Sequence, residues 1–249
     1  MRKSLIVVSS LLAVATVLMG QKPKSPKETE AVMAVMKATS PDEKIAAVEN
    51  LMSKFKDTEF KSYALFQAAQ ASQVKGDQVN ALQYGNRAIE ADPKNFQALL
   101  LVSGLLAQGT REFDLDKDEK LGRATKMAND AQAAVNAAVK PNPALTDEQW
   151  AGIKKDMISQ AHDTLGMVAM VNKKYDTAIT EFKTSIDGAA TPDLTTSVRL
   201  AVAYTNTGKF DDSVALLDKV IASPGASEPV KKAAQNEKQR IEKVKAATK

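Results

Sequence analysis

The sequence predicts an all-α protein built as a solenoid of helix-turn-helix repeats. Three observations support this fold class: apolar residues recur at helical spacing over long windows, runs of β-branched residues are scarce, and similar turns recur between amphipathic segments. Ile45, Val48, Leu51 and Phe55 show the helical spacing. Pro, Gly and Asn interrupt the apolar pattern at short intervals, which predicts helices of about 12–18 residues joined by tight turns.

Residues 1–20 have the pattern of an export signal. Arg2 and Lys3 precede the apolar run Leu5–Met19, which is too short to span a ~30 Å hydrocarbon layer comfortably. Small residues predict cleavage after Ala15 or after Gly20, and no Cys follows that could take a bacterial lipid anchor. We therefore expect an exported protein, periplasmic or secreted. An uncleaved N-terminal segment that tethers the protein to the membrane is the alternative.

Residues 21–29 are rich in Lys, Pro and Ser and are interpreted as a linker, because Pro23 and Pro26 disfavour helix around them. Two helices are then expected near residues 26–38 and 41–56. Ser40 precedes the second, where it offers a capping hydroxyl ahead of Pro41 and two acidic residues. These two helices are interpreted as a diverged first repeat.

Three turns share one pattern, at residues 76–82, 173–179 and 208–214. Each has a turn, then an aromatic residue or Val, two polar residues, a small residue and an aliphatic residue. Each also follows an amphipathic segment of similar length, and self-similarity at a fixed period is the signature of repeat architectures.

This pattern resembles the tetratricopeptide repeat (TPR), a pair of helices that recurs every ~34 residues. The clearest repeats span residues 62–95, 159–191 and 194–227, and their matching residues include Leu65, Ala69, Ala81, Tyr84, Ala88, Pro93, Leu165, Gly166, Ala178, Phe182, Leu200, Ala201, Tyr204 and Gly208. His162, Gly85 and Ser213 depart from the family pattern. The resemblance implies a right-handed superhelix of about five helix pairs over residues 30–230.

The middle of the chain is less regular. Residues 96–108 predict a helix, residues 109–120 a charged loop, and residues 121–140 a second helix with Ala on one face. We interpret this as a repeat with a longer connection. Residues 141–143 break the chain before a long helix that runs through Trp150 to Val171. Residues 231–249 predict a basic capping helix, which keeps the end of a solenoid soluble.

The charge of the chain lies mostly at its two ends. The formal net charge is +4, but the N-terminal signal and the C-terminal helix are basic, and residues 21–230 are slightly acidic. Bulk electrostatics therefore gives no reason to expect nucleic acid or another polyanion as a ligand. Membrane contact is expected only through an uncleaved N-terminus.

Few residues of catalytic or metal-binding type are present. Zero Cys and a single His exclude disulfides, Cys-ligated zinc, iron–sulfur clusters, thiol nucleophiles and multi-His metal sites. His162 is interpreted as a packing residue. Residues 114–118 open like a calcium loop, but Glu119 stands where the turn glycine belongs, so a solvated acidic loop is expected. We expect no cofactor, no metal and no enzymatic activity.

The resemblance to TPR proteins implies a groove lined by the first helix of each pair, which takes a peptide. The Lys/Asn/Arg clamp that some members use is absent, since Asp163, Met167 and Val202 are among the residues at its positions. The groove is instead predicted to be lined by Tyr63, Phe66, Gln70, Gln73, Met167, Met170, Thr195 and Val198. The sequence thus predicts a non-enzymatic interaction scaffold of the cell envelope. A carboxylate-based envelope hydrolase or carbohydrate-binding module stays open as the alternative, beside the membrane-tethered assembly factor.

Overall fold

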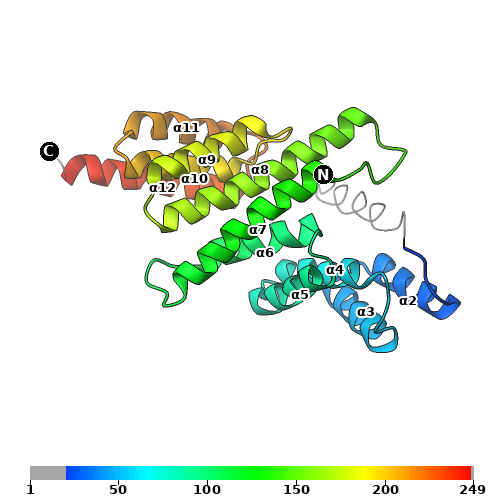
Figure 1. Ribbon diagram of the computed structural model, residues 1–249. Helices are drawn as coiled ribbons and strands as arrows, with labels where there is room; N and C mark the ends of the chain where they lie inside the picture. Colours follow the sequence, from blue (N-terminus) through cyan, green and yellow to red (C-terminus); the bar gives the residue numbers. More distant parts are fainter. Residues whose placement is uncertain (1–20, 248–249) are drawn as a thin grey trace. The chain divides into compact units, whose positions relative to one another are not determined.

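The computed structural model describes residues 21–247, and the predicted export signal at residues 1–20 lies outside them. Within residues 21–247 the chain forms eleven helices and no strand, which confirms the all-α prediction. The helices are α2 (Pro26–Lys37), α3 (Pro41–Lys54), α4 (Lys61–Val74), α5 (Gln78–Ala91), α6 (Phe96–Gly109), α7 (Lys117–Ala137), α8 (Asp147–Val171), α9 (Tyr175–Gly188), α10 (Leu194–Asn206), α11 (Phe210–Ala222) and α12 (Glu228–Ala247) (Figure 1).

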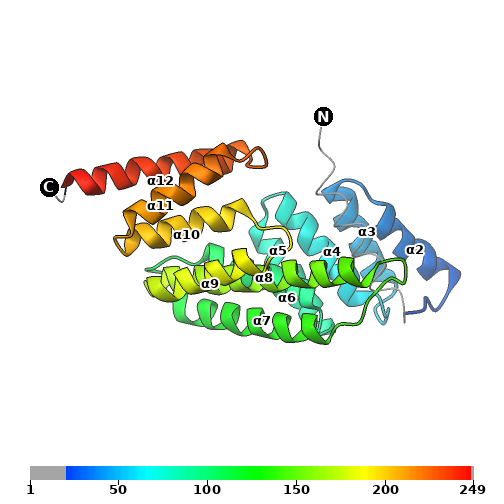
Figure 2. The same ribbon diagram turned by 90° about the horizontal axis from the view of Figure 1, so that it is seen from above.

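The chain divides into two compact units, and each is described by itself. Among the described residues, unit 1 contains 21–105 and 130–151, and unit 2 contains 106–129 and 152–247. In unit 1, α4 packs against both α3 and α5, and α2 packs against α3. In unit 2, α9, α10, α11 and α12 pack against one another in chain order (Figure 2). Neighbouring elements along the sequence are therefore neighbours in space, as a repeat fold requires.

Local side-chain chemistry sets where several helices begin. The Ser40 hydroxyl accepts from the backbone N–H of Glu43, and the Glu43 carboxylate accepts from the N–H of Ser40, each at 3.2 Å. This capping box fixes the start of α3 at the predicted residue. Ser25 caps α2 in a similar way, so α2 begins at Pro26, inside the segment interpreted as a linker. That segment also contacts the fold, because Lys24 Nζ donates to the Asp57 carbonyl at 2.7 Å.

The three aligned turns share one backbone conformation. Gly76, Lys173 and Gly208 all have a positive φ, of 76°, 58° and 78°. In each turn the N–H of the next residue donates to a carbonyl five positions earlier, at 2.9 Å each time. This pattern closes a helix on a left-handed residue, for which glycine is the favoured type. The structure therefore repeats the turn that the sequence repeats.

Close approach of helices depends on small residues and on buried hydrogen bonds. A Cβ atom at Gly85 would lie 2.5 Å from Val102 Cγ2, so α5 and α6 meet at that glycine in unit 1. In unit 2 the Ser185 hydroxyl donates to the Ser159 carbonyl at 2.8 Å, and this bond joins α9 to α8. In unit 1 the corresponding pair of positions is joined in the opposite direction, because the Ser62 hydroxyl of α4 donates to the Ala88 carbonyl of α5 at 2.8 Å.

Candidate functional site

Unit 2 contains an open cavity of about 330 Å³ on the face formed by α8 and α10. Its walls are mostly apolar, with two arginines at the rim. We call it the methionine pocket, and it is lined by Ala107, Gln108, Thr110, Arg111, Met167, Met170, Val171, Phe182, Val198, Arg199 and Val202.

The repeat architecture places the apolar walls. Val198 and Val202 are four residues apart and share one face of α10. Phe182 of α9 is fully buried and reaches the pocket because the residue opposite its ring, Gly166, has no side chain. Met167 is 9% exposed, and the thioether side chains of methionine can repack around differently shaped partners. The pocket is therefore an adaptable apolar surface in contact with solvent.

The two arginines of the pocket differ in how they are paired. Arg199 Nη1 donates to Asp163 Oδ2 at 2.6 Å, and the Thr196 hydroxyl donates to Asp163 Oδ1 at 3.0 Å. Burial raises the pKa of Asp163 above its usual value and outweighs the opposing effects of Arg199 and Thr196. Arg111 Nη1 donates to the Gln108 carbonyl at 2.8 Å, and in the described part of the chain it forms no ion pair. Arg111 therefore keeps its positive charge available.

The connection between α6 and α7 holds Arg111 at the rim of the pocket. The Arg111 backbone N–H donates to Asp114 Oδ2 at 2.9 Å, and the Asp114 N–H donates back to the Arg111 carbonyl at 3.2 Å. Glu112 forms a 2.5 Å ion pair with Lys173, in the turn between α8 and α9. Two apolar side chains of this connection, Phe113 and Leu115, are almost wholly exposed.

The predicted acidic loop pairs its carboxylates with lysines. Asp116 lies 2.9 Å and Asp114 3.9 Å from Lys120 Nζ. Across residues 21–247, no three His, Cys, Asp or Glu side chains gather closely enough to hold a metal ion. His162 Nδ1 lies 2.7 Å from Glu181 Oε2, and both side chains are more than three-quarters buried, as suits packing residues.

The structure brings together three of the eight predicted groove residues. Met167, Met170 and Val198 line the methionine pocket, and Thr195 lies half-buried on α10 outside its lining. The other four are on α4 in unit 1. Among them, Tyr63 and Phe66 are buried in the core of that unit, while Gln70 is half-buried and Gln73 is exposed.

Tyr63 is an unusual member of that core. Its side chain is 2% exposed, and its hydroxyl has no hydrogen-bond partner among the described residues. Burial raises the pKa of this hydroxyl to about 12. Tyr63 is packed among the core residues of unit 1. The predicted role of Tyr63 and Phe66 in a groove stays a prediction.

Gln108, Thr110 and Arg111 are polar members of the pocket that are absent from the predicted groove. Gln108 lies in the last turn of α6 and the other two in the connection after it, which the repeat pattern does not describe, and only the fold brings them beside α8 and α10. Val202 lies four residues after Val198, so helical spacing could have found it, whereas Arg199 adjoins Val198 in the sequence and only the fold shows that it lines the pocket.

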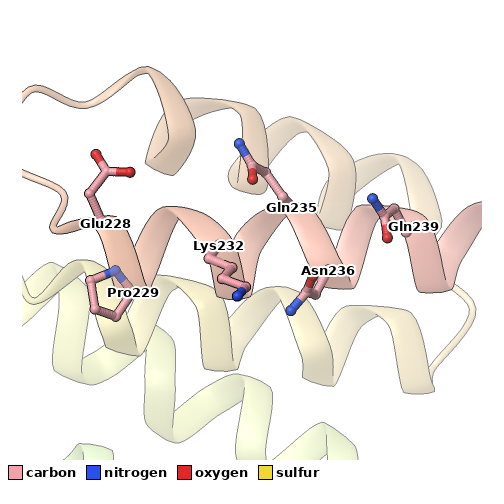
Figure 3. Close-up of a pocket in the computed structure, with 6 residues that line it drawn as sticks. All are labelled: Glu228, Pro229, Lys232, Gln235, Asn236 and Gln239. Carbon is pink, nitrogen blue, oxygen red and sulfur yellow. The ribbon is translucent and has the colours of Figure 1, made fainter.

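A second, polar depression of about 550 Å³ runs along α12 (Figure 3). Its lining consists of one helix face, made of Glu228, Pro229, Lys232, Gln235, Asn236 and Gln239. Several basic residues of the same helix are paired: Lys245 lies 3.0 Å from Asp211, and Lys238 2.5 Å from Asp218. Two basic residues of the C-terminal helix are thus paired with acidic residues of α11.

The fold is that of TPR proteins. The structure superposes on the TPR protein TTC0263 of Thermus thermophilus with a TM-score of 0.55 and 16% identity, over 84% of this chain and 98% of that chain. It superposes on MamA of Desulfovibrio magneticus RS-1 with a TM-score of 0.56 and 13% identity, over 78% and 93%. At these identities the likeness shows the fold alone.

No family model and no curated protein matches the sequence. Among the helices of residues 21–247, none combines the length and apolar character needed to cross a membrane. The repeat architecture predicted from the three aligned turns is confirmed by these structural neighbours.

Proposed function

We propose that this chain is a non-enzymatic scaffold of the cell envelope that binds a segment of a partner protein across α8 and α10. The observation that supports this most directly is the methionine pocket. Folded proteins bury most large apolar side chains, and a solvent-open apolar depression with polar groups at its rim is typical of a binding site. TPR-type solenoids stack helix pairs whose first helices form such a surface, and α8 and α10 are the first helices of two adjacent repeats.

The envelope location rests on the predicted export signal and is part of the proposal. Mass spectrometry of the N-terminus of the protein purified from its host tests it. We expect a mature chain that begins at residue 16 or residue 21. A chain that begins at Met1 or Arg2 and fractionates with membranes would instead support the tethered alternative.

Site-specific photocrosslinking in living cells tests the binding surface. A photoreactive amino acid at Val202, in the pocket, should crosslink the chain to a defined protein. The control position is Lys219, which is exposed on α11 outside the pocket. The same set of crosslinked proteins from both positions, or none from Val202, would contradict the proposal that the pocket binds a partner.

A carboxylate-based hydrolase has less support. Asp163 is a buried carboxylate with a raised pKa beside the pocket, whereas such an enzyme would need two adjacent carboxylates of this kind. The two oxygens of Asp163 also accept hydrogen bonds from Arg199 and Thr196. We propose that Asp163 orients Arg199 and takes no part in chemistry.

A further inference from the structure

We propose that the methionine pocket recognises an apolar side chain that is adjacent to a carboxylate in an extended peptide, and that Arg111 pairs with that carboxylate. This inference rests on the proposed function and specifies the chemistry of its ligand. It depends on three features of unit 2: the size and lining of the pocket, the unequal pairing of its two arginines, and the way in which the connection after α6 holds Arg111.

The size and the lining select an apolar side chain. A volume of about 330 Å³ is near the lower end of the ~300–1,000 Å³ range of small-molecule clefts, which is room for one large side chain and its neighbours. Met167, Met170 and Val202 would surround it. Because methionine repacks easily, the pocket should accept Leu, Ile, Met or Phe with little discrimination among them.

The pairing of the arginines selects a negative charge beside that side chain. Two arginines and no acidic residue are in the lining of the pocket. Asp163 neutralises Arg199, but no described carboxylate pairs with Arg111. A guanidinium group can donate two parallel hydrogen bonds to one carboxylate, so an Asp or Glu side chain, or a chain terminus, complements Arg111.

The backbone around Arg111 is already ordered, which favours this pairing. Asp114 bonds the Arg111 backbone in both directions, and the Glu112–Lys173 ion pair joins the same connection to the end of α8. A group held in its binding position loses less conformational freedom when the ligand arrives. This longer connection is also what distinguishes the third helix pair from a regular repeat.

An anionic membrane could also offer negative charge and apolar chains, but the surroundings of Arg111 disfavour it. Glu112 and Asp114 are the neighbours of Arg111 in the same connection, so a surface with many negative charges would meet these carboxylates as well. A peptide can present one carboxylate to one guanidinium group. Binding to lipid is therefore treated as an outcome that would overturn the proposal.

Selection from a random twelve-residue peptide library on phage, against the purified full-length chain, tests the proposal. Peptides in which a large apolar residue adjoins Asp or Glu should be enriched. Selection should be repeated on Arg111→Gln, on Val202→Asp and on Lys219→Gln, which removes a positive charge from an exposed position outside the pocket. Circular dichroism checks that each variant is folded.

Fluorescence anisotropy on one selected peptide then measures the pairing. We expect Arg111→Gln to raise Kd about tenfold, and replacement of the peptide acid by its amide to do the same. The two changes together should raise Kd no further than either alone, because they remove one interaction. Lys219→Gln should leave Kd unchanged.

The outcomes separate this inference from the proposed function. If Val202→Asp abolishes selection but the enriched peptides have no adjacent acid, the pocket binds a partner and the inference about Arg111 is wrong. If Val202→Asp leaves the enriched set unchanged, both are wrong. Stronger retention of the chain on phosphatidylglycerol vesicles than on the selected peptide, lost in Arg111→Gln, would also overturn the inference.

Discussion

Replacement of Gly166 by alanine tests the closest contact between α8 and α9. A Cβ atom at this position would lie 2.4 Å from Phe182 Cε1 and 2.5 Å from Phe182 Cδ1. Carbon atoms in van der Waals contact are about 3.5–4.0 Å apart, so the ring would have to move by about 1 Å. Phe182 is fully buried, so its ring can shift only toward the methionine pocket that it lines, and such a shift gives up part of its packing.

The magnitude follows from two opposing effects. Alanine is favoured over glycine inside a helix by about 1 kcal/mol. Insertion of an extra carbon into a well-packed core costs about 1–3 kcal/mol, and a contact this short on a buried ring corresponds to the upper end. We expect Gly166→Ala to lower the free energy of unfolding by roughly 1–2 kcal/mol.

Gly122 provides a matched control in the same unit. It lies inside α7, it is exposed, and a Cβ atom there would have nothing within 4 Å. Gly122→Ala should therefore stabilise the protein by about 0.5–1 kcal/mol. Urea unfolding followed by circular dichroism measures both variants, and the two changes should differ in sign.

A double variant isolates the contact itself. Phe182→Leu alone should destabilise the protein, but it leaves room for a Cβ at position 166. The effect of Gly166→Ala should then be smaller in the Phe182→Leu background than in the original chain. If Gly166→Ala proves as stable as Gly122→Ala, or if its effect is unchanged beside Phe182→Leu, the close packing of α8 on the Phe182 ring is refuted.

Three further predictions concern other parts of the molecule. Phe113→Ser together with Leu115→Ser should change the free energy of unfolding by less than about 0.5 kcal/mol in urea titrations, because both side chains are 87% exposed or more. Ser185→Ala should cost about 0.5–1.5 kcal/mol in the same assay, because it removes the buried 2.8 Å hydrogen bond between α9 and α8. Burial raises the pKa of Asp163 above 3.8, so the folded chain holds this proton more tightly than the unfolded chain. Stability should therefore fall as pH rises from 3.8 through the raised pKa, and thermal melts of Asp163→Asn should show less of this fall.

The sequence predicts the repeat because its signals are local. Ser40 and Glu43 cap α3 through neighbouring atoms, and the turns at Gly76 and Gly208 need a left-handed residue wherever the helices are packed. Such signals survive even when the apolar residues between them diverge. This explains why the three aligned turns indicate the fold although the two superposed structures are at most 16% identical.

The sequence of α4 does not show which face of this helix is exposed. Most residues of α4 are buried, because α3 and α5 pack against two sides of it and α2 approaches as well. Polar and apolar residues are spread around α4, so its sequence has no periodicity that marks an exposed face, and only the resemblance to TPR proteins assigned Tyr63 and Phe66 to a groove. Both side chains lie in the core of unit 1, and their role in a groove stays a prediction. Met167 and Val198, assigned through the same resemblance, lie in the lining of the methionine pocket.

Local pairing of charges, rather than their total, determines what the pocket can bind. The C-terminal helix has more basic than acidic residues, yet Lys238 and Lys245 pair with acidic residues of α11. Arg111 belongs to a slightly acidic stretch, yet its guanidinium group forms no ion pair among the described residues. Net charge thus argues against a polyanionic ligand but says nothing about a single carboxylate. Net charge does not predict a ligand with one negative charge beside an apolar side chain. That proposal depends on the contacts that the connection after α6 makes with the end of α8.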